Sequence, residues 1–235
     1  MGVALEETLD FVTSRLPARA RILEVGCGSG ALARALLARG HEVVGIDRSE
    51  KAVKSARVAG FEAQRADFLE YEDEPFEAVL FTRSLHHIHE LEAAVERAHG
   101  LLVPEGVLLA DDFALERMDR KTASWLRDQR RLLAAADVVK AHRHDGDPLE
   151  SWRSEHAHVP PLHEGKVMLA ALRRRFGRVT AERAPYLYRY FCEELDGTSR
   201  GEAVARTLLE TETRLVRERA LVAIGLRVCA KRTRR

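Results

Sequence analysis

Three glycines at alternate positions follow a short apolar run near the start of the chain. Gly26, Gly28 and Gly30 come directly after residues 21–25, and helix-forming sequence rich in Ala and Leu begins at Ala31. Such a loop lets a buried strand turn sharply into a helix, because glycine tolerates turns and close approaches that a side chain forbids. The free N–H groups of the loop and the helix dipole favour a ligand carboxylate or phosphate. The loop therefore predicts a strand–loop–helix unit with a ligand at the carboxyl end of the strand.

Strand-like apolar runs alternate with helical segments through the first 112 residues. Strands are expected at 21–25, 42–46, 61–65, 76–82 and 106–110, and helices at 5–16, 31–39, 49–59 and 91–102. Alternation with short connections predicts a parallel sheet with right-handed crossovers. The apolar strands indicate that helices cover both faces of the sheet. The predicted fold class is therefore α/β, with a Rossmann-like doubly wound sheet.

The pattern changes after residue 113. The second half is expected to hold a long helix within 115–139, an irregular stretch at 142–163, helices at 167–175 and 201–219, and strands within 178–190 and at 221–229. The two later strands would complete a mostly parallel, seven-stranded sheet.

We expect a single domain with three parts. Residues 1–112 would hold the N-terminal helix and the ligand-binding half, and residues 164–235 would complete the sheet. Between them, residues 113–163 would form a lid-like insertion of helix and loop after strand five, without a core of its own.

Composition limits the class of protein. The formal net charge of +1 argues against a protein built mainly to coat nucleic acid. The three cysteines are far apart and form no CxxC pair, which suits a reducing cytoplasm and argues against a cysteine-based zinc site. No apolar run approaches the roughly 18 residues of a membrane span. We therefore expect a cytoplasmic protein with a small-molecule partner and without nucleic-acid or membrane partners, whose oligomeric state the sequence leaves open.

An acidic residue follows the second predicted strand. Asp47 lies about 20 residues after the first glycine of the loop, where a carboxylate can bind ribose hydroxyls. The loop and Asp47 together indicate a nucleoside cofactor in a doubly wound sheet. Gly26, Gly28 and Ala31 also satisfy the relaxed dinucleotide pattern G-x-G-x-x-G/A, so NAD remains an alternative.

Five ordered motifs lie within residues 20–112, at 22–30, 44–47, 66–68, 76–88 and 102–109. Together they resemble those of class I S-adenosylmethionine-dependent methyltransferases, in particular the small-molecule group related to ubiquinone C-methyltransferases. Two positions depart from the family pattern: Glu77 stands where Asp is usual, and Glu105 stands where a second turn glycine is common. The resemblance implies S-adenosylmethionine as the cofactor.

The resemblance also assigns roles to individual positions. The glycine loop would approach the methionine portion of the cofactor, Asp47 would accept hydrogen bonds from the ribose, and Asp67 would accept one from the adenine amino group. The implied cofactor-binding residues are Glu24, Gly26, Cys27, Gly28, Gly30, Asp47, Arg48, Asp67, Phe68, Arg83 and Ser84. Two of these side chains also suit structural roles, since Glu24 can interact with a helix N-terminus and Asp67 can cap a short turn. Cys27 is expected to be a small residue that fits the loop.

Methyl transfer from a sulfonium requires an aligned acceptor, and an oxygen or nitrogen acceptor also has to lose a proton. A neutral histidine suits that step, since its unperturbed pKa is about 6.5. Candidate bases are His86, His144 and His156, and candidate substrate contacts are Asp111, Trp152, Tyr186 and Tyr188.

Each candidate base or substrate contact has a structural alternative. One histidine of the 86–87 pair is commonly structural in the family, Asp111 can cap the next helix, and the tyrosines at 186, 188 and 190 alternate like a strand face that packs in the core. The histidines between 142 and 163 also suit a lid surface, substrate contact or a metal site. No metal is predicted, because no carboxylate cluster completes a site.

The sequence therefore favours an S-adenosylmethionine-dependent methyltransferase that transfers a methyl group by in-line displacement to a small molecule, with oxygen or nitrogen as the acceptor atom. Two alternatives stay open. One is a non-catalytic cofactor-binding protein of the same fold, because no single residue is obligatory for methyl transfer. The other is an NAD-dependent oxidoreductase, although the motifs after the glycine loop do not resemble that class.

Overall fold

The structure is a computed structural model that describes residues 2–140, 146–192, 194–195 and 197–233. Its internal contacts divide the chain into two compact units. The sheet unit comprises Glu7–Asp112, His163–Glu182 and Leu226–Arg235, and the helical unit comprises Met1–Glu6, Phe113–Leu162 and Arg183–Gly225. The proposed single-domain organisation remains a prediction.

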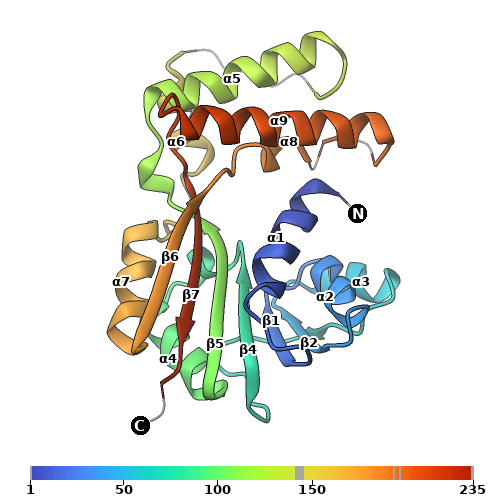
Figure 1. The fold of residues 1–235 in the computed structure, drawn as a ribbon, viewed down its shortest axis with the longest axis vertical. Coiled ribbons are helices and arrows are strands. Elements are labelled where there is room, and N and C mark those ends of the chain that lie inside the picture. Colours follow the sequence, from blue (N-terminus) through green and yellow to red (C-terminus); the bar gives the residue numbers. More distant parts are fainter. Residues whose placement is uncertain (1, 141–145, 193, 196, 234–235) are drawn as a thin grey trace. The chain divides into compact units, whose positions relative to one another are not determined.

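A seven-stranded sheet runs through the described residues in the order β3-β2-β1-β4-β5-β7-β6 (Figure 1). Its strands are β1 (Arg21–Val25), β2 (Glu42–Asp47), β3 (Gln64–Arg65), β4 (Phe76–Thr82), β5 (Leu102–Phe113), β6 (Arg178–Ala184) and β7 (Gly225–Lys231). All but a few end residues of β5, β6 and β7 belong to the sheet unit. The five strands from β3 to β5 pair in parallel.

β7 runs antiparallel to β5. The N–H of Arg232 donates to the carbonyl of Gly106, and the N–H of Ala114 donates to the carbonyl of Ile224. Residue numbers therefore rise along one strand as they fall along the other, which defines an antiparallel pair. The predicted α/β fold with a mostly parallel seven-stranded sheet is confirmed.

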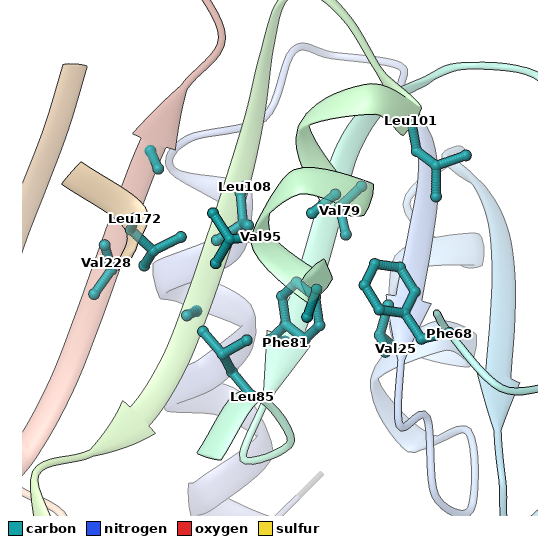
Figure 2. Close-up of a cluster of buried hydrophobic side chains, with 14 of the residues drawn as sticks. Val25, Phe68, Val79, Phe81, Leu85, Val95, Leu101, Leu108, Leu172 and Val228 are labelled. Atoms are coloured by element: carbon teal, nitrogen blue, oxygen red, sulfur yellow. The ribbon is translucent and has the colours of Figure 1, made fainter. Parts of the chain in front are cut away.

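Helices cover both faces of the sheet (Figure 1). One face carries α4 (Leu91–Leu101) and α7 (Gly165–Arg175), and the other carries α2 (Ala31–Leu37), α3 (Glu50–Val58) and much of α1 (Val3–Thr13). Figure 2 shows how Val95 and Leu101 of α4 face Val79, Phe81 and Leu108 of the strands, and each of these side chains is at most 7% exposed. This burial on both faces explains why the strand sequences are apolar throughout.

The helical unit has its own buried cluster. It is built from α5 (Arg120–Ala135), α6 (Pro148–Glu155), α8 (Arg189–Cys192) and α9 (Ser199–Arg217), together with the short helix η2 (Leu115–Arg117). Buried side chains include Phe113, Leu126, Trp152, Tyr188 and Leu208. Residues 113–162 therefore share a core with residues 186–224 rather than lacking one.

Three local expectations were wrong. Residues 142–163 were expected to be irregular, but they contain α6, which begins with Asp147 as its N-cap and Pro148 in its first turn. The strand expected at 61–65 is reduced to β3, because Phe61 turns inward to pack against the glycine loop. The alternating tyrosines at 186–190 lie in a turn and in α8 rather than on a strand.

None of the helices in the described part of the chain combines the length and the apolar character that a membrane span requires.

Candidate functional site

A cavity of about 290 Å³ opens in the sheet unit at the carboxyl ends of β1, β2 and β4. The strand order reverses here, because the chain runs from β1 outward to β2 and β3 and then returns to β4 on the other side of β1. Doubly wound sheets bind ligands at such a switch point. The lining residues are Val25, Gly26, Ile46, Asp47, Arg48, Ala66, Asp67, Phe68, Leu69, Arg83, Ser84, His87, Ile88 and Glu90.

The cavity brings together many of the residues predicted to bind the cofactor: Gly26, Asp47, Arg48, Asp67, Phe68, Arg83 and Ser84. The predicted residues Glu24, Cys27, Gly28 and Gly30 are not part of the lining. His87, Ile88 and Glu90 complete the wall and were not singled out as cofactor-binding. The histidine pair at 86–87 was the available sequence signal, but the predicted residue was His86 and the cavity-lining residue is His87.

The glycine loop requires glycine for different reasons at different positions. Gly26 has a φ of +74°, and a Cβ there would lie 2.7 Å from the Cβ of Ser84. Gly28 has a φ of +55°, and a Cβ there would meet no described atom within 4 Å. A Cβ on Gly30 would lie 2.6 Å from the ring of Phe61, so glycine allows close packing at the helix start. Gly28 therefore has open space beside it, although it does not line the cavity.

Asp47 connects the glycine loop to the start of α3 through two hydrogen bonds. Its Oδ2 accepts a hydrogen bond from the N–H of Gly28 at 3.0 Å, and its Oδ1 accepts one from the N–H of Ser49 at 2.8 Å. Each carboxylate oxygen has a second lone pair. Asp47 can therefore hold the loop in place and still accept hydrogen bonds from a ligand in the cavity that it lines.

The rim beyond β3 combines a capping residue with an aromatic wall. Asp67 Oδ1 accepts a hydrogen bond from the N–H of Leu69 at 3.0 Å, so Asp67 caps a short turn, while its Oδ2 lies 3.5 Å from Nε of Arg48. Phe68 packs edge-on against Phe81, with ring centroids 5.3 Å apart. Figure 2 shows these two rings close to Val25. The cavity thus has an apolar wall with charged groups at its edge.

The turn after β4 is strained and tightly bonded. Arg83 has a φ of +58°, a region that non-glycine residues rarely adopt and that recurs at ligand sites. Its N–H donates to the carbonyl of Asp111 at 2.9 Å. Ser84 donates its hydroxyl to the carbonyl of Val25 at 2.6 Å. These bonds fix the ends of β1, β4 and β5 relative to one another.

Glu24 is a buried acid on β1 with an unsatisfied oxygen. The residue is 2% exposed, its Oε1 lies 3.5 Å from the hydroxyl of Thr82, and its Oε2 has no hydrogen-bond partner among the described residues. Burial raises the pKa of Glu24 to about 8, and the Thr82 hydroxyl and the nearby backbone N–H of Ala33 oppose this only in part. A buried acceptor without a partner is costly, so it is suited to a ligand donor.

Cys27 behaves as the small residue that the sequence predicted. It packs with Ala33 and Phe61 in a buried cluster. Burial raises the pKa of its thiol to about 12, so the thiol stays protonated near neutral pH.

The two histidines after β4 have different surroundings. His86 is 5% exposed, and its Nδ1–H donates to Oδ1 of the buried Asp112 at 2.6 Å. His87 is exposed and lines the cavity. The sequence proposed His86 as a base, but within the sheet unit it is His87 that faces the cavity.

Asp111, a predicted substrate contact, is also buried and bonded to other residues of the sheet unit. It is 4% exposed, its Oδ2 accepts a hydrogen bond from Thr8 at 2.7 Å, and its Oδ1 lies 3.4 Å from Nε of Arg227. It does not line the cavity. Asp111 therefore links β5 to α1 and β7, a role the sequence did not suggest.

Three other candidates meet in an aromatic cluster inside the helical unit, which also contains Phe113 and Tyr190. The ring of Trp152 lies 3.8 Å from that of His156, and Tyr186 stacks on Phe113 at 4.9 Å. His156 bonds through Nδ1 to the carbonyl of Trp152 and through Nε2 to the hydroxyl of Tyr190, both at 2.8 Å. Burial lowers the pKa of His156. The neutral ring is therefore favoured, and its Nε2 can accept a hydrogen bond from the Tyr190 hydroxyl.

Tyr188 is fully buried in the same unit, which supports packing as its role. His144, the remaining candidate base, lies outside the described residues. Within the part of the chain that the structure describes, no group of three His, Cys, Asp or Glu side chains is arranged to hold a metal ion.

Glu212 was missed by the sequence. It is fully buried on α9, and its carboxylate accepts hydrogen bonds from the N–H groups of Tyr186, Leu187 and Tyr188 at 2.7–3.0 Å. Burial raises its pKa, against the effect of these bonds. Its position four residues after Leu208, on the apolar face of the helix, was the available signal.

The sequence similarity to known proteins lies in the first half of the chain. Residues 23–110 match the sequence model of a family described as "Methyltransferase domain". A ubiquinone biosynthesis O-methyltransferase of Xylella fastidiosa is 34% identical over 110 residues, which covers 43% of this chain and 45% of the relative. The chain thus aligns with less than half the length of this curated relative.

Solved structures support the fold over nearly the whole chain. The plantazolicin methyltransferase BamL, solved with a triazolic desmethylPZN analog and SAH, has a TM-score of 0.56 at 18% identity and covers 98% of this chain and 84% of its own. The [4+2]-cyclase SpnF has a TM-score of 0.59 at 20% identity and covers 97% of this chain and 80% of its own. At these identities the likeness concerns the fold alone.

Proposed function

We propose that the protein binds S-adenosylmethionine in the cavity of the sheet unit and transfers its methyl group to a small-molecule acceptor, because residues 23–110 match the sequence model of the methyltransferase domain family. The observation that carries this proposal is the arrangement at the switch point. There Gly26 of the glycine loop, Asp47 and Ser84 line one cavity, and Asp47 bonds to the loop at Gly28.

The residues present fit this cofactor. Glu24 offers a buried oxygen without a partner, which suits a ligand ammonium group. Asp47 retains lone pairs for ribose hydroxyls, and Phe68 and Ile88 give an apolar wall for a flat base. Gly28 leaves open the space that a Cβ would fill. When bound, the cofactor supplies a methyl group that is already activated by a sulfonium.

The protein's own contribution is then to orient the acceptor, exclude water and accept a proton. We favour oxygen as the acceptor atom, because the similar Xylella protein is named an O-methyltransferase. His87 is the cavity-lining histidine in the sheet unit, and a neutral imidazole there suits removal of a hydroxyl proton. We assign the proton-accepting role to His87 in place of His86.

Calorimetric titration with S-adenosylmethionine and S-adenosylhomocysteine, with NADH as the control ligand, tests the cofactor. We expect both sulfur ligands to bind and NADH not to bind. Asp47→Asn should weaken binding about tenfold through the loss of a charged acceptor, whereas Asp10→Asn, an exposed site in the same unit, should bind like wild type. Binding of NADH alone would overturn the proposal.

A second candidate function is a protein of this fold that binds the cofactor without transferring its methyl group. The observation in its favour is the fold-level likeness to SpnF, which is named a cyclase rather than a methyltransferase. Turnover with radiolabelled methyl donor over a panel of phenols, catechols and amines separates the two. Product on any hydroxyl supports methyl transfer to oxygen, whereas tight cofactor binding without turnover on the whole panel favours the second function.

A further inference from the structure

The loop that follows β4 forms one wall of the cavity. Residues 85–87 make the single turn η1 (Leu85–His87), and His87, Ile88 and Glu90 line the cavity. Within the loop, the N–H of His87 donates to Ser84 and the N–H of Ile88 donates to Leu85. These local bonds shape a turn, but they do not attach it to the rest of the unit.

Leu85 is buried in the core of the unit, and the polar attachment comes from two residues that lie behind the wall. Asp112 accepts the Nδ1–H of His86 at 2.6 Å and its backbone N–H at 3.4 Å. His163 donates its backbone N–H to the carbonyl of His86 at 3.0 Å. Its Nε2 lies 3.0 Å from the carbonyl of Ile88 and 3.1 Å from that of His89. Since both partners are acceptors, this nitrogen carries the proton.

These contacts indicate that the buried His86–Asp112 pair holds the loop in place rather than transferring a proton. His86 and Asp112 are 5% and 1% exposed and do not line the cavity. The ring of His86 lies 4.1 Å from the ring of His87, so a fixed His86 limits where the cavity-facing ring can turn. His163 contacts the carbonyls of His86, Ile88 and His89, and these contacts hold the backbone on either side of His87.

We infer that His163 and the His86–Asp112 pair are positioning residues, which hold residues 85–90 from behind so that His87 and Ile88 face the ligand. The structural part of this inference stands on the hydrogen bonds alone. The ligand part rests on the proposed function. A merely structural role would lower the stability of the unit as a whole, whereas a positioning role acts on the cavity wall.

The test compares His163→Ala and His163→Gln with wild type in the full-length protein. We expect His163→Ala to raise the amide hydrogen-exchange rates of residues 85–90 about tenfold and to weaken the binding of S-adenosylhomocysteine about tenfold. His163→Gln keeps a side-chain N–H donor and should recover most of both losses. His86→Asn, which keeps a donor toward Asp112, should exchange more slowly in this segment than His86→Ala.

His99→Ala is the matched control. His99 is 9% exposed in the same unit, bonds to Arg175 and packs on Phe176, but it does not line the cavity. It should lower the Tm like His163→Ala without changing exchange in 85–90 or affinity. The inference is overturned if the amide hydrogen-exchange rates of residues 85–90 are the same in His163→Ala and His99→Ala. It is also overturned if His163→Ala exchanges faster in this segment but binds S-adenosylhomocysteine as tightly as wild type. If wild type binds neither sulfur ligand, the proposed function fails, and the exchange data alone decide the structural part.

Discussion

The cavity of the sheet unit and the aromatic cluster of the helical unit are built in opposite ways. The cavity gathers residues from short motifs that each follow a strand, because parallel strands bring their carboxyl ends to one edge. The cluster joins Phe113, Trp152 and His156 with Tyr186 and Tyr190, from three segments that are far apart in the sequence and meet only through tertiary packing. One site is specified by chain order, the other by which side chains fit together.

The largest expected effect is on the packing of the cluster. Trp152 is 3% exposed and packs with the rings of Phe113, His156 and Tyr190. Trp152→Ala should lower the free energy of unfolding by about 3–5 kcal/mol, as measured by urea denaturation. Leu132→Ala in α5, 63% exposed in the same unit, should change it by less than about 0.5 kcal/mol. Equal losses would mean that the cluster is not a core.

The next effect concerns the buried acceptor of the helical unit. Glu212→Ala leaves three backbone N–H groups without their acceptor and should cost about 3 kcal/mol. Glu212→Gln keeps Oε1, which takes two of the three bonds, and should cost about half as much. Glu210→Ala, exposed on the same helix, is the control for helix propensity. Denaturation midpoints that fail to rank in this order would refute the bonding scheme.

In the sheet unit the sharpest comparison is between two glycines. Gly28 and Gly40 both have positive φ and open space beside them, but only Gly28 belongs to the loop at the cavity. Alanine at either position should cost about 1 kcal/mol of stability. Gly28→Ala should also weaken S-adenosylhomocysteine binding about thirtyfold through overpacking, whereas Gly40→Ala should not. Calorimetry on both variants checks this, and equal affinities would show that the open space is not used.

The smallest effect is the pH dependence of Glu24, whose pKa of about 8 lies above its ordinary value of 4.5. The folded state therefore binds the extra proton, and this contribution to stability falls as pH rises from about 5 to 8. A ligand ammonium favours the ionised form, so binding should release a proton and strengthen about tenfold from pH 6 to 7, where the ammonium itself stays protonated.

Glu24→Gln should remove both trends, and Glu62→Gln, with a side chain 91% exposed, should remove neither. Titrations in buffers of different ionisation enthalpy measure the released proton. A wild-type affinity that is flat over this pH range would argue against an ammonium group beside Glu24.

The sequence made the sheet unit more predictable than the helical unit, where the two largest effects are expected. Most sheet strands and the residues Gly26, Asp47 and Ser84 followed from motifs, because their placement needs only strand order. The motifs did not decide between His86 and His87, because adjacent residues of a turn point in different directions. Glu212 and α6 were missed, because a buried acid and a helix in a histidine-rich stretch depend on distant partners.

The strand order has a consequence for how the protein is made. β6 joins the sheet only through β7, which lies between it and β5, yet β6 is synthesised first. During translation the parallel strands β1 to β5 can therefore assemble as they emerge, while β6 has no strand to pair with. One edge of the nascent sheet stays open until residues 225–231 leave the ribosome. Over that interval β5 offers an unpaired edge to chaperones and to other chains.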